Sequence, residues 1–327
     1  MKDKILDILK SSRDYVSGED ISSSLGISRA AVWKHIKGLK EEGYEIESSS
    51  KKGYRLLESP DVLTYKELKN LLTTNYIGRK IVYLESTTST NDIAKEYAEK
   101  GEKEGLVVIA EVQTKGRGRM GRRWITPGRD SISITILLRP EISPYMAPSI
   151  TPVLAVSVVE MLREITGFEI GIKWPNDVVL DRKKVCGILT EMSAEIDVVK
   201  YIIVGIGINV NQETFDNEIE NIATSLRKYS GKKYDRKAIL SGILNRFERN
   251  YELFKKEGIG PFIEDLKKYS VLIGKKVLIS GINEEYEAEA IDIDDDGALL
   301  VRLENGDVKK VLSGDVSIKG FYGYNSK

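Results

Sequence analysis

The chain has 327 residues, which is enough for two or three domains, and its 41% hydrophobic and 31% charged residues are ordinary for a soluble globular protein. Lysine plus arginine and aspartate plus glutamate number 50 each, so the overall charge points to no class of partner. The single cysteine excludes an intrachain disulfide framework, and the single histidine excludes a Ser-His-Asp triad in the central region and a histidine-rich metal cage.

The first 62 residues predict a winged helix-turn-helix domain. A first helix has an apolar face, a second starts at the N-cap Ser17 and is ended by Gly26, and a third starts at Ser28. Residues 46–57 then predict a hairpin. The chain enters this domain without a signal-peptide core, and no stretch approaches the length of a membrane span, so we expect a cytoplasmic protein with no membrane partner.

Basic residues gather on the third helix and at the hairpin tip. Residues 28–40 carry four basic residues and no acid, and the hairpin tip adds more. This pattern is typical of a winged helix that meets the phosphate backbone and major groove of DNA. The candidate DNA contacts are Ser28, Arg29, Trp33, Lys34, Lys37, Lys51 and Lys52. The alternative is a protein-interaction domain with a solvated charged helix.

Residues 63–270 predict a mixed α/β domain, which begins after a linker marked by Pro60. Apolar or alternating runs predict its strands, and two long apolar-patterned segments predict helices over 149–165 and 235–254. The expected strands cover 106–112, 131–138, 185–192 and 198–210. Glycine- or proline-marked loops lie around positions 116, 175 and 207.

Residues 271–327 change to short strands separated by turn signals such as Asp296-Gly297 and Asn305-Gly306. The expected form is a small β-barrel. Between positions 271 and 321 there are 11 acidic and 6 basic residues, which makes this segment a poor nucleic-acid binder.

The chemistry-bearing run is residues 113–124, QTKGRGRMGRRW. Five of the nine residues from 115 to 123 are basic and three are glycine. Glycines let the backbone approach an anion closely, and arginines add forked cationic clamps. The run suits a phosphate together with a carboxylate, although it lacks the Walker pattern. Its alternatives are a flexible basic surface loop and a nucleic-acid contact.

Three further elements belong with this loop. Lys173 opens the segment KWPND, where Pro175 favours an extended residue before it and aims the lysine from a strand end. Residues 85–92 are rich in serine and threonine and either cap a helix or bind a polar head group. The segment 205–209, GIGIN, places two glycines in a strand, which suggests the close approach of another group. Cys186 lies inside a predicted strand and is expected to be a buried structural thiol.

Together these elements resemble the biotin–protein ligases, in particular the bifunctional class that also represses the biotin operon. The stretches GRGRMGRRW and KWPND are the most specific parts of the resemblance, and Met120 departs from it where many members have a basic residue. The resemblance covers the whole chain. It implies an α+β multidomain protein with a winged helix-turn-helix over 1–62, a ligase domain similar to class II synthetases over 63–270, and an SH3-like β-barrel over 271–327.

The resemblance also implies roles for individual residues. Lys173 and Arg119 would be catalytic, with Lys173 at the reacting carboxylate and the α-phosphate. Biotin would be bound by Ser89, Thr90, Asn91, Gln113, Arg117, Gly118, Arg119 and Lys173. ATP or the adenylate would be bound by Gly116, Arg117, Arg119, Arg122, Trp124, Asn176, Asn209 and Phe215.

In this family, biotin and ATP give biotinyl-5′-AMP, and a lysine of the biotin carboxyl carrier protein then takes the biotinyl group. The resemblance therefore implies biotin and ATP as ligands, Mg²⁺ accompanying ATP near Asn176 and Asp177, and no metal site of the protein's own. It also implies operator DNA as a partner and a homodimer when the adenylate is bound. The basic loop is expected to be mobile until an anion orders it.

Three other interpretations stay open at the level of sequence. One is a lipoate or octanoate ligase of similar fold. Another is a transcription regulator that senses a ligand without turnover. The third is a nucleic-acid enzyme that uses the basic run on phosphates.

Overall fold

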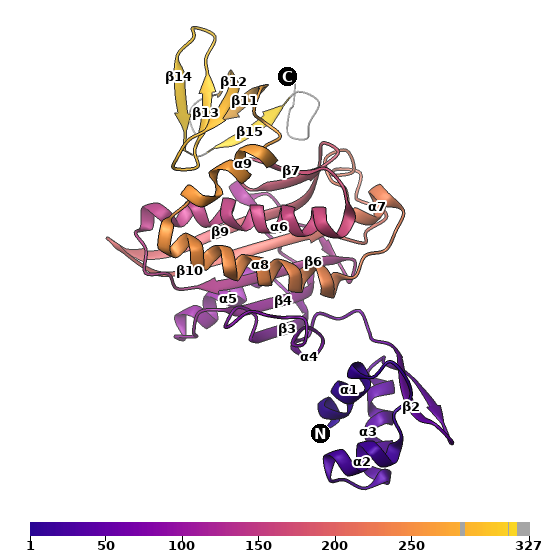
Figure 1. Cartoon of the computed structure of the whole chain (residues 1–327). Coiled ribbons are helices and arrows are strands. Elements are labelled where there is room, and N and C mark those ends of the chain that lie inside the picture. Colours follow the sequence, from indigo (N-terminus) through magenta and orange to yellow (C-terminus); the bar gives the residue numbers. More distant parts are fainter. Residues whose placement is uncertain (282–284, 313, 319–327) are drawn as a thin grey trace. The chain divides into compact units, whose positions relative to one another are not determined.

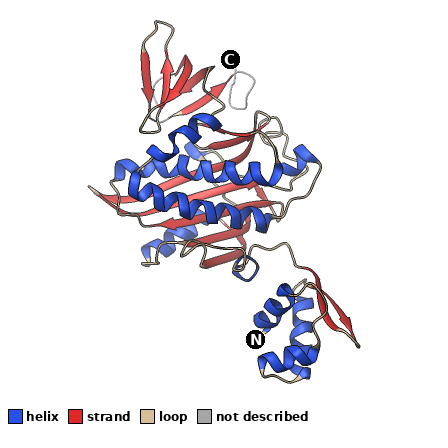
Figure 2. Cartoon of the chain, in the orientation of Figure 1, coloured by secondary structure: helices blue, strands red, loops and turns tan. Residues whose placement is uncertain are grey.

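A computed structural model gives the fold of the chain and describes residues 1–281, 285–312 and 314–318. Contacts divide it into two compact units, Met1–Val62 and Leu63–Lys327 (Figure 1). Helices and strands alternate through the second unit, whereas three helices precede a hairpin in the first (Figure 2).

The first unit is the winged helix-turn-helix predicted from the sequence. Its elements are α1 (Lys2–Ser11), α2 (Gly18–Leu25), α3 (Arg29–Glu41), β1 (Glu45–Ser49) and β2 (Gly53–Glu58). The hydroxyls of Ser17 and Ser28 accept backbone N–H groups of α2 and α3, and Gly26 ends α2 in the left-handed conformation with φ 64°. These caps set the turn between the two helices, and one apolar cluster of all three helices holds them together.

An eight-stranded sheet forms the centre of the second unit. The strand order is β3-β4-β6-β10-β9-β8-β7, with β5 paired to β4; β3 and β4 are parallel and the other pairs are antiparallel. The strands are β3 (Lys80–Thr87), β4 (Leu106–Gln113), β5 (Thr126–Pro127), β6 (Ser131–Leu138), β7 (Ile170–Lys173), β8 (Asp177–Leu180), β9 (Lys183–Glu195) and β10 (Val198–Asn209).

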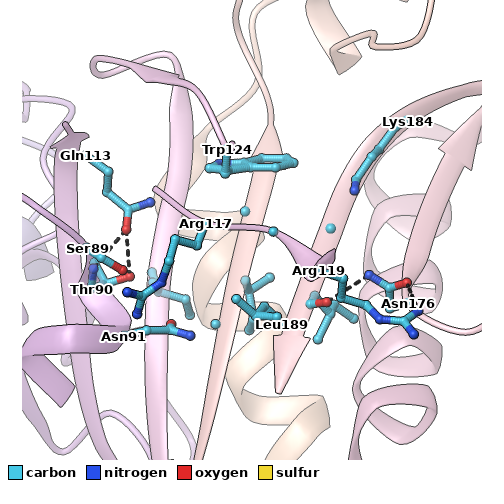
Figure 3. A pocket seen from close by; sticks show the side chains of 17 residues that line it. Ser89, Thr90, Asn91, Gln113, Arg117, Arg119, Trp124, Asn176, Lys184 and Leu189 are labelled. Carbon is cyan, nitrogen blue, oxygen red and sulfur yellow. Dashed lines mark hydrogen bonds between the residues drawn. The ribbon is translucent and has the colours of Figure 1, made fainter. Parts of the chain in front are cut away.

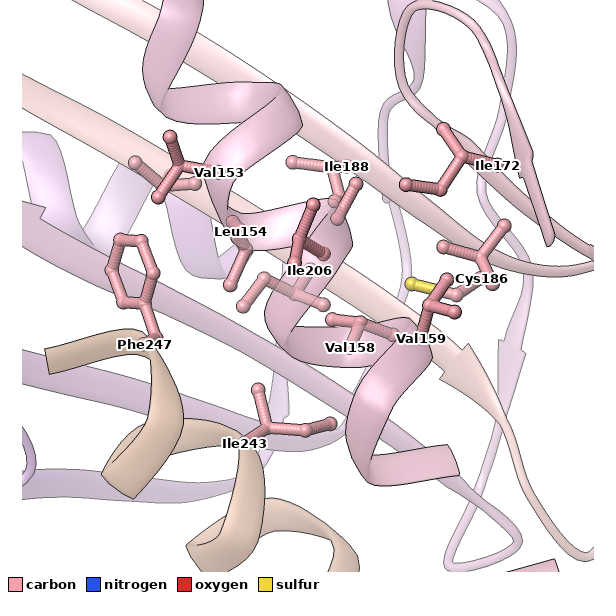
Figure 4. Close-up of a cluster of buried hydrophobic side chains, with 14 of the residues drawn as sticks. Val153, Leu154, Val158, Val159, Ile172, Cys186, Ile188, Ile206, Ile243 and Phe247 are labelled. Carbon is pink, nitrogen blue, oxygen red and sulfur yellow. The ribbon is translucent and has the colours of Figure 1, made fainter. Parts of the chain in front are cut away.

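Helices cover both faces of this sheet. The long helices α6 (Ile150–Thr166) and α8 (Arg236–Glu257) pack on one face, where Val158, Ile206 and Phe247 belong to the main core (Figure 4). On the other face α5 (Thr90–Glu99) packs its alanines against the strands. Shorter helices are α4 (Tyr65–Leu68), η1 (Arg119–Gly121), η2 (Pro144–Ser149), α7 (Leu226–Ser230), η3 (Gly260–Phe262) and α9 (Ile263–Tyr269).

The segment Pro144–Thr166 contradicts the expectation that no stretch approaches the length of a membrane span. By length and composition it is a helical stretch that could cross a membrane, which the sequence analysis did not recognise. Of its most apolar part, 67% is buried in the fold. A core helix of a folded domain has the same length and composition, and α6 is such a helix, because it packs against both α8 and the sheet.

The small β domain expected at the C-terminal end is a five-stranded antiparallel sheet with order β14-β13-β12-β11-β15. Its strands are β11 (Lys275–Ser280), β12 (Glu285–Ile293), β13 (Leu299–Arg302), β14 (Val308–Val311) and β15 (Asp315–Ile318). Gly297 and Gly306 adopt positive φ at the two predicted turns. The sequence analysis missed β15, which brings Asp315 next to the basic loop.

Candidate functional site

A small cavity opens at the end of β4, where the basic loop lies across β9 and β10 (Figure 3). It brings together residues from six separate parts of the sequence. The lining residues are Ser89, Thr90, Asn91, Gln113, Arg117, Gly118, Arg119, Trp124, Ile134, Asn176, Lys184, Gly187, Ile188, Leu189, Gly205, Ile206 and Gly207. Its free space is about 40 Å³.

One end of the cavity is a buried polar cluster. The backbone N–H and hydroxyl of Thr90 donate to Gln113 Oε1 at 2.8 and 3.1 Å. Thr135 Oγ1 lies 2.7 Å from Thr90 Oγ1 and 2.6 Å from Asn91 Oδ1. The N-terminal turn of α5 and the polar face of β6 are thereby locked together, so these side chains present hydrogen-bonding groups in fixed directions.

Carboxylates hold Arg117 beside this cluster. Arg117 donates to Asp92, and its Nη2 lies 4.0 Å from Glu191 Oε2. Glu191 also accepts from Asn91 and Lys95, each at 2.6 Å. Burial alone would raise the pKa of Glu191, but these two hydrogen bonds and the nearby cations hold it below its usual value. In this arrangement the guanidinium of Arg117 is therefore paired with the carboxylate of Asp92 and lies near that of Glu191.

Trp124 forms one wall of the cavity. Its ring lies against Gly187 and Gly207, and a Cβ at Gly207 would overlap the indole. The indole Nε1 is buried and has no hydrogen-bond partner within the described part of the chain. A buried donor without an acceptor costs free energy, so this N–H is poised for an acceptor on a ligand.

The opposite end of the cavity is cationic. Arg119 donates to Asn176 Oδ1 at 3.0 Å and to the carbonyl of Gly314 at 3.2 Å, which ties the basic loop to the β7–β8 turn and the C-terminal sheet. Lys184 Nζ lies 2.6 Å from Asp177 Oδ1 and 5.6 Å from the centroid of the Trp124 ring. The arrangement concentrates positive charge where an anionic reacting group would lie.

Nine of the predicted ligand-binding residues line the cavity, and five do not. Ser89, Thr90, Asn91, Gln113, Arg117, Gly118, Arg119, Trp124 and Asn176 line it, whereas Lys173, Gly116, Arg122, Asn209 and Phe215 lie outside its lining. Gly116 supports the wall, since its carbonyl accepts from Trp124 N at 3.0 Å. Arg122 pairs with Asp315. Asn209 Oδ1 accepts from Gln212 at 3.0 Å, and the Phe215 ring lies beneath Lys228.

Lys173 and Lys184 lie on neighbouring strands on either side of Asp177. Lys173 ends β7 opposite Asp177, and its side chain is buried with 2% exposed. Burial lowers the pKa of Lys173, while Asp177 and Asp315 act in the opposite direction. Lys184, which the sequence analysis did not single out, lines the cavity. Cys186 is fully buried, and burial raises the pKa of its thiol, as expected for a structural residue.

A larger cleft opens beside the cavity and shares Arg119, Asn176 and Ile188 with it. Its volume is about 1080 Å³. Apolar side chains of η2, β9 and the C-terminal sheet line it, and acidic residues stand among them: Glu257, Asp295 and Asp296. This cleft gives a wide approach to the cationic end of the cavity.

The predicted DNA contacts occupy the exposed side of the first unit. Arg29, Trp33, Lys34 and Lys37 are exposed on α3, and Lys51 and Lys52 lie at the hairpin tip. Ser28 is engaged in capping α3, with its hydroxyl 3.2 Å from Ala31 N. The Lys52 ammonium lies 5.4 Å from the centroid of the Tyr15 ring, which holds part of the tip against the domain.

Comparison with known proteins decides the family. Residues 2–55 match an HTH domain model, 83–209 match the biotin/lipoate A/B protein ligase family, and 272–319 match the biotin protein ligase C-terminal domain. The bifunctional ligase/repressor BirA of Bacillus subtilis is 40% identical over 319 residues, covering 97% of this chain and 98% of the relative. The chain belongs to the bifunctional biotin ligase/repressor family.

Other relatives agree with this assignment. The Escherichia coli bifunctional ligase/repressor BirA is 30% identical over 307 residues, or 94% of each chain. The biotin protein ligase from Aquifex aeolicus, solved with biotin and ATP, matches with 33% identity and a TM-score of 0.65 over 73% of this chain and 98% of its own. The comparisons confirm the predicted family, and with it a ligase that also carries a repressor's helix-turn-helix domain.

Proposed function

We propose that the chain joins biotin to AMP and then transfers the biotinyl group to a lysine of a biotin carboxyl carrier protein. The cavity carries this proposal because it has fixed hydrogen-bonding groups at one end and cations at the other. The relative from Mycobacterium tuberculosis, 32% identical over 245 residues, is named a biotin–[acetyl-CoA-carboxylase] ligase. That name supports a carboxylase carrier protein as acceptor.

In the first step a carboxylate oxygen of biotin attacks the α-phosphorus of ATP, and the bond to pyrophosphate breaks. The polar cluster of Thr90, Asn91 and Gln113 would hold the ureido ring, which offers both donors and an acceptor. Arg117, Arg119 and Lys184 would stabilise the negative charge that gathers on the carboxylate and the phosphoryl oxygens. Both reactants are anions, so fixed cations provide most of what the step needs, and histidine is not required.

Lys184 rather than Lys173 is proposed as the lysine at the reacting centre. Its ammonium lines the cavity and is oriented by Asp177 at 2.6 Å. Lys173 approaches the same aspartate from β7 but is buried beneath the site. We assign Lys173 a supporting role, in which its charge helps to fix Asp177.

Mg²⁺ is proposed to arrive with ATP and to neutralise its phosphates, without a dedicated protein site. Asn176 and Asp177, which the sequence predicts to organise the metal, each contact another side chain of the site. Asp177 Oδ1 is taken by Lys184, and Asn176 Oδ1 accepts from Arg119.

The large cleft is the proposed route for the acceptor lysine. It reaches the cavity at Arg119, Asn176 and Ile188, where the activated carbonyl would lie. The lysine amine then attacks the carbonyl carbon of the mixed anhydride, AMP leaves, and an amide bond forms. Glu257 and Asp295 along the cleft favour the approach of a basic side chain, whereas Asp296 is paired with Lys310.

The winged helix is proposed to bind operator DNA as part of a homodimer that forms when the adenylate is bound. Two copies would read two half-sites, because a single winged helix covers only one. The β9–β10 hairpin supports a dimer, since Ile196 is 98% exposed and Val198 and Met192 are also exposed at its end.

Transfer of labelled biotin to a purified biotin carboxyl carrier domain tests the ligase proposal. We expect label on the carrier only when ATP is present, and no competition from a large excess of lipoate. Labelling by lipoate but not by biotin would assign the chain to the sister activity instead.

We expect Gly207→Ala to raise the KM for biotin by about tenfold or more, because overpacking of this kind costs ~1–3 kcal/mol. The added methyl would overlap the Trp124 ring and force it into the cavity. Gly260→Ala is the matched control, since no atom lies within 4 Å of its added Cβ. Steady-state adenylation kinetics measure both variants, and an unchanged KM in Gly207→Ala would contradict this placement of Trp124.

We expect Asp92→Asn to lower the KM for biotin by about two- to fivefold. The Asp92 carboxylate pairs with Arg117 in competition with the anionic ligand, and a half-exposed ion pair of this kind contributes ~0.2–1 kcal/mol. The gain should shrink as salt is raised. Biotin titration at low and high ionic strength checks the effect, and a higher KM in the variant would show that Asp92 positions Arg117 for the ligand.

A further inference from the structure

Trp33 is a large aromatic side chain that the fold leaves in solvent. It lies on α3 and is 59% exposed, whereas Val32, Ile36 and Leu39 of the same helix are buried in the core of the unit. A single exposed apolar residue is common on protein surfaces and needs no explanation. The surroundings of Trp33, rather than its exposure alone, indicate a binding role.

Basic side chains flank Trp33 on the outer surface of α3. Arg29 and Lys37 lie four residues before and after it, so all three share one helical face, and Lys34 lies next to it. The Lys37 ammonium is 5.9 Å from the centroid of the Trp33 ring. Arg29 lies 3.7 Å from Glu19 with both side chains largely exposed, which is a weak tether. The face is therefore basic with one apolar surface at its centre.

The side chains on this face of α3 limit which DNA bases it can recognise. In a helix-turn-helix the second helix of the pair enters the major groove, and α3 is that helix. The lysines and arginine can reach phosphates or purine acceptors. Indole has a single donor and no acceptor, so it cannot form the paired hydrogen bonds that distinguish guanine or adenine. The thymine C5-methyl is the apolar group that the major groove offers, and it matches the ring face.

We propose that Trp33 packs against a thymine C5-methyl in the major groove and makes thymine the preferred base at one position of each operator half-site. This inference rests on the proposed DNA-binding function. The neighbouring cations hold the duplex at the helix, and Trp33 supplies discrimination at one base pair.

Replacement of thymine by deoxyuridine tests the contact, since it removes only the methyl group. Duplexes selected by the full-length protein from a random pool, with biotin and ATP present, serve as probes. Each thymine is then replaced in turn, and binding is followed by fluorescence anisotropy. We expect one position per half-site where uracil weakens binding by about fourfold, the value of one buried methyl.

Variants of the full chain assign the effect to Trp33. In Trp33→Ala the uracil penalty at that position should vanish, while penalties at other positions stay. Trp33→Phe should keep part of it, because an apolar ring remains. Lys34→Gln and Lys37→Gln should weaken binding to thymine and uracil duplexes equally and reduce the salt dependence. Thermal melting and biotin-dependent adenylation show that each variant is folded.

The outcomes separate this inference from the function beneath it. Sequence-specific binding with the same uracil pattern in Trp33→Ala would overturn the thymine contact and leave the repressor function intact. If Trp33→Ala binds too weakly to be measured, Trp33→Phe decides. A smaller uracil penalty at the expected position supports the contact, and a penalty as large as in the parent chain overturns it. Failure to select any duplex would overturn the DNA-binding function itself.

Discussion

Lys184→Met is expected to reduce biotin-dependent adenylation by about 10²–10³-fold, the usual effect of removing one preorganised group that stabilises transition-state charge. Methionine keeps much of the length and apolar volume of lysine, so the cavity wall should stay intact while the charge is lost. The ammonium lies 2.6 Å from Asp177 Oδ1 and lines the cavity. The rate of pyrophosphate exchange into ATP, at saturating biotin and ATP, measures the change.

Lys173→Met is the matched comparison on the other side of Asp177. We expect less than about tenfold loss of adenylation, because Lys173 lies outside the lining of the cavity. The loss that does occur should come from Asp177, whose position the charge of Lys173 helps to fix. A larger fall in the exchange rate in Lys173→Met than in Lys184→Met would show that Lys173, as the sequence resemblance implies, is the lysine at the reacting centre. The assignment to Lys184 would then be wrong.

Arg119→Gly is expected to shorten the retention of biotinyl-5′-AMP by about tenfold or more, as loss of a charge-assisted contact of ~1.5–3 kcal/mol implies. Arg119 ties the basic loop to Asn176 and to the carbonyl of Gly314, at 3.0 and 3.2 Å. Without these bonds the loop should cover the adenylate poorly. Activated biotin would then escape and label lysines of bystander proteins such as serum albumin.

Arg123→Gly is the control that distinguishes loss of the Arg119 hydrogen bonds from loss of positive charge in the loop. It removes one cation from the same segment, but Arg123 is exposed and does not line the cavity. Adenylate retention, measured by rapid gel filtration of the enzyme loaded with labelled biotin, should fall in Arg119→Gly and change little in Arg123→Gly. Equal retention in the two variants would show that the contacts of Arg119 do not close the loop.

Local signals in the sequence predicted most of the architecture. Ser17, Gly26 and Ser28 cap the helices of the winged domain as expected, and the Asp-Gly and Asn-Gly turns mark the C-terminal hairpins. Such signals depend on only a few neighbouring residues, so they can be recognised in the sequence without knowledge of the tertiary fold. The strand β15 was not predicted, although it is as long as β13 and β14.

The site could be predicted in part, since the basic loop and the residues 89–91 stand out by composition. Lys184 could not be found in this way, because its place depends on strand pairing. A register shift between Val178 and Val179 sets Lys184 beside Val179 in the β8–β9 hairpin. Gly187 then pairs with Gly207, and together they leave room for the Trp124 ring. Pairing across strands follows from the whole sheet, and spacing along the chain does not reveal it.

The role of the serine and threonine residues that alternate with isoleucine in β6 also becomes clear only in the folded structure. Such a pattern usually indicates a strand with one face in water. Here both faces are buried, and Thr135 on the polar face bonds Thr90 and Asn91 at the cavity. The polar residues of β6 thus support the ligand site instead of facing solvent.

Exchange of labelled pyrophosphate into ATP by the unmodified chain, with biotin or lipoate as the acid, tests the central claim most directly. Adenylation is reversible, so exchange reports the formation of the mixed anhydride without any acceptor protein. We expect exchange that requires biotin, is not supported by lipoate, and is lost in Lys184→Met. Exchange with lipoate alone, or no exchange with either acid, would contradict it.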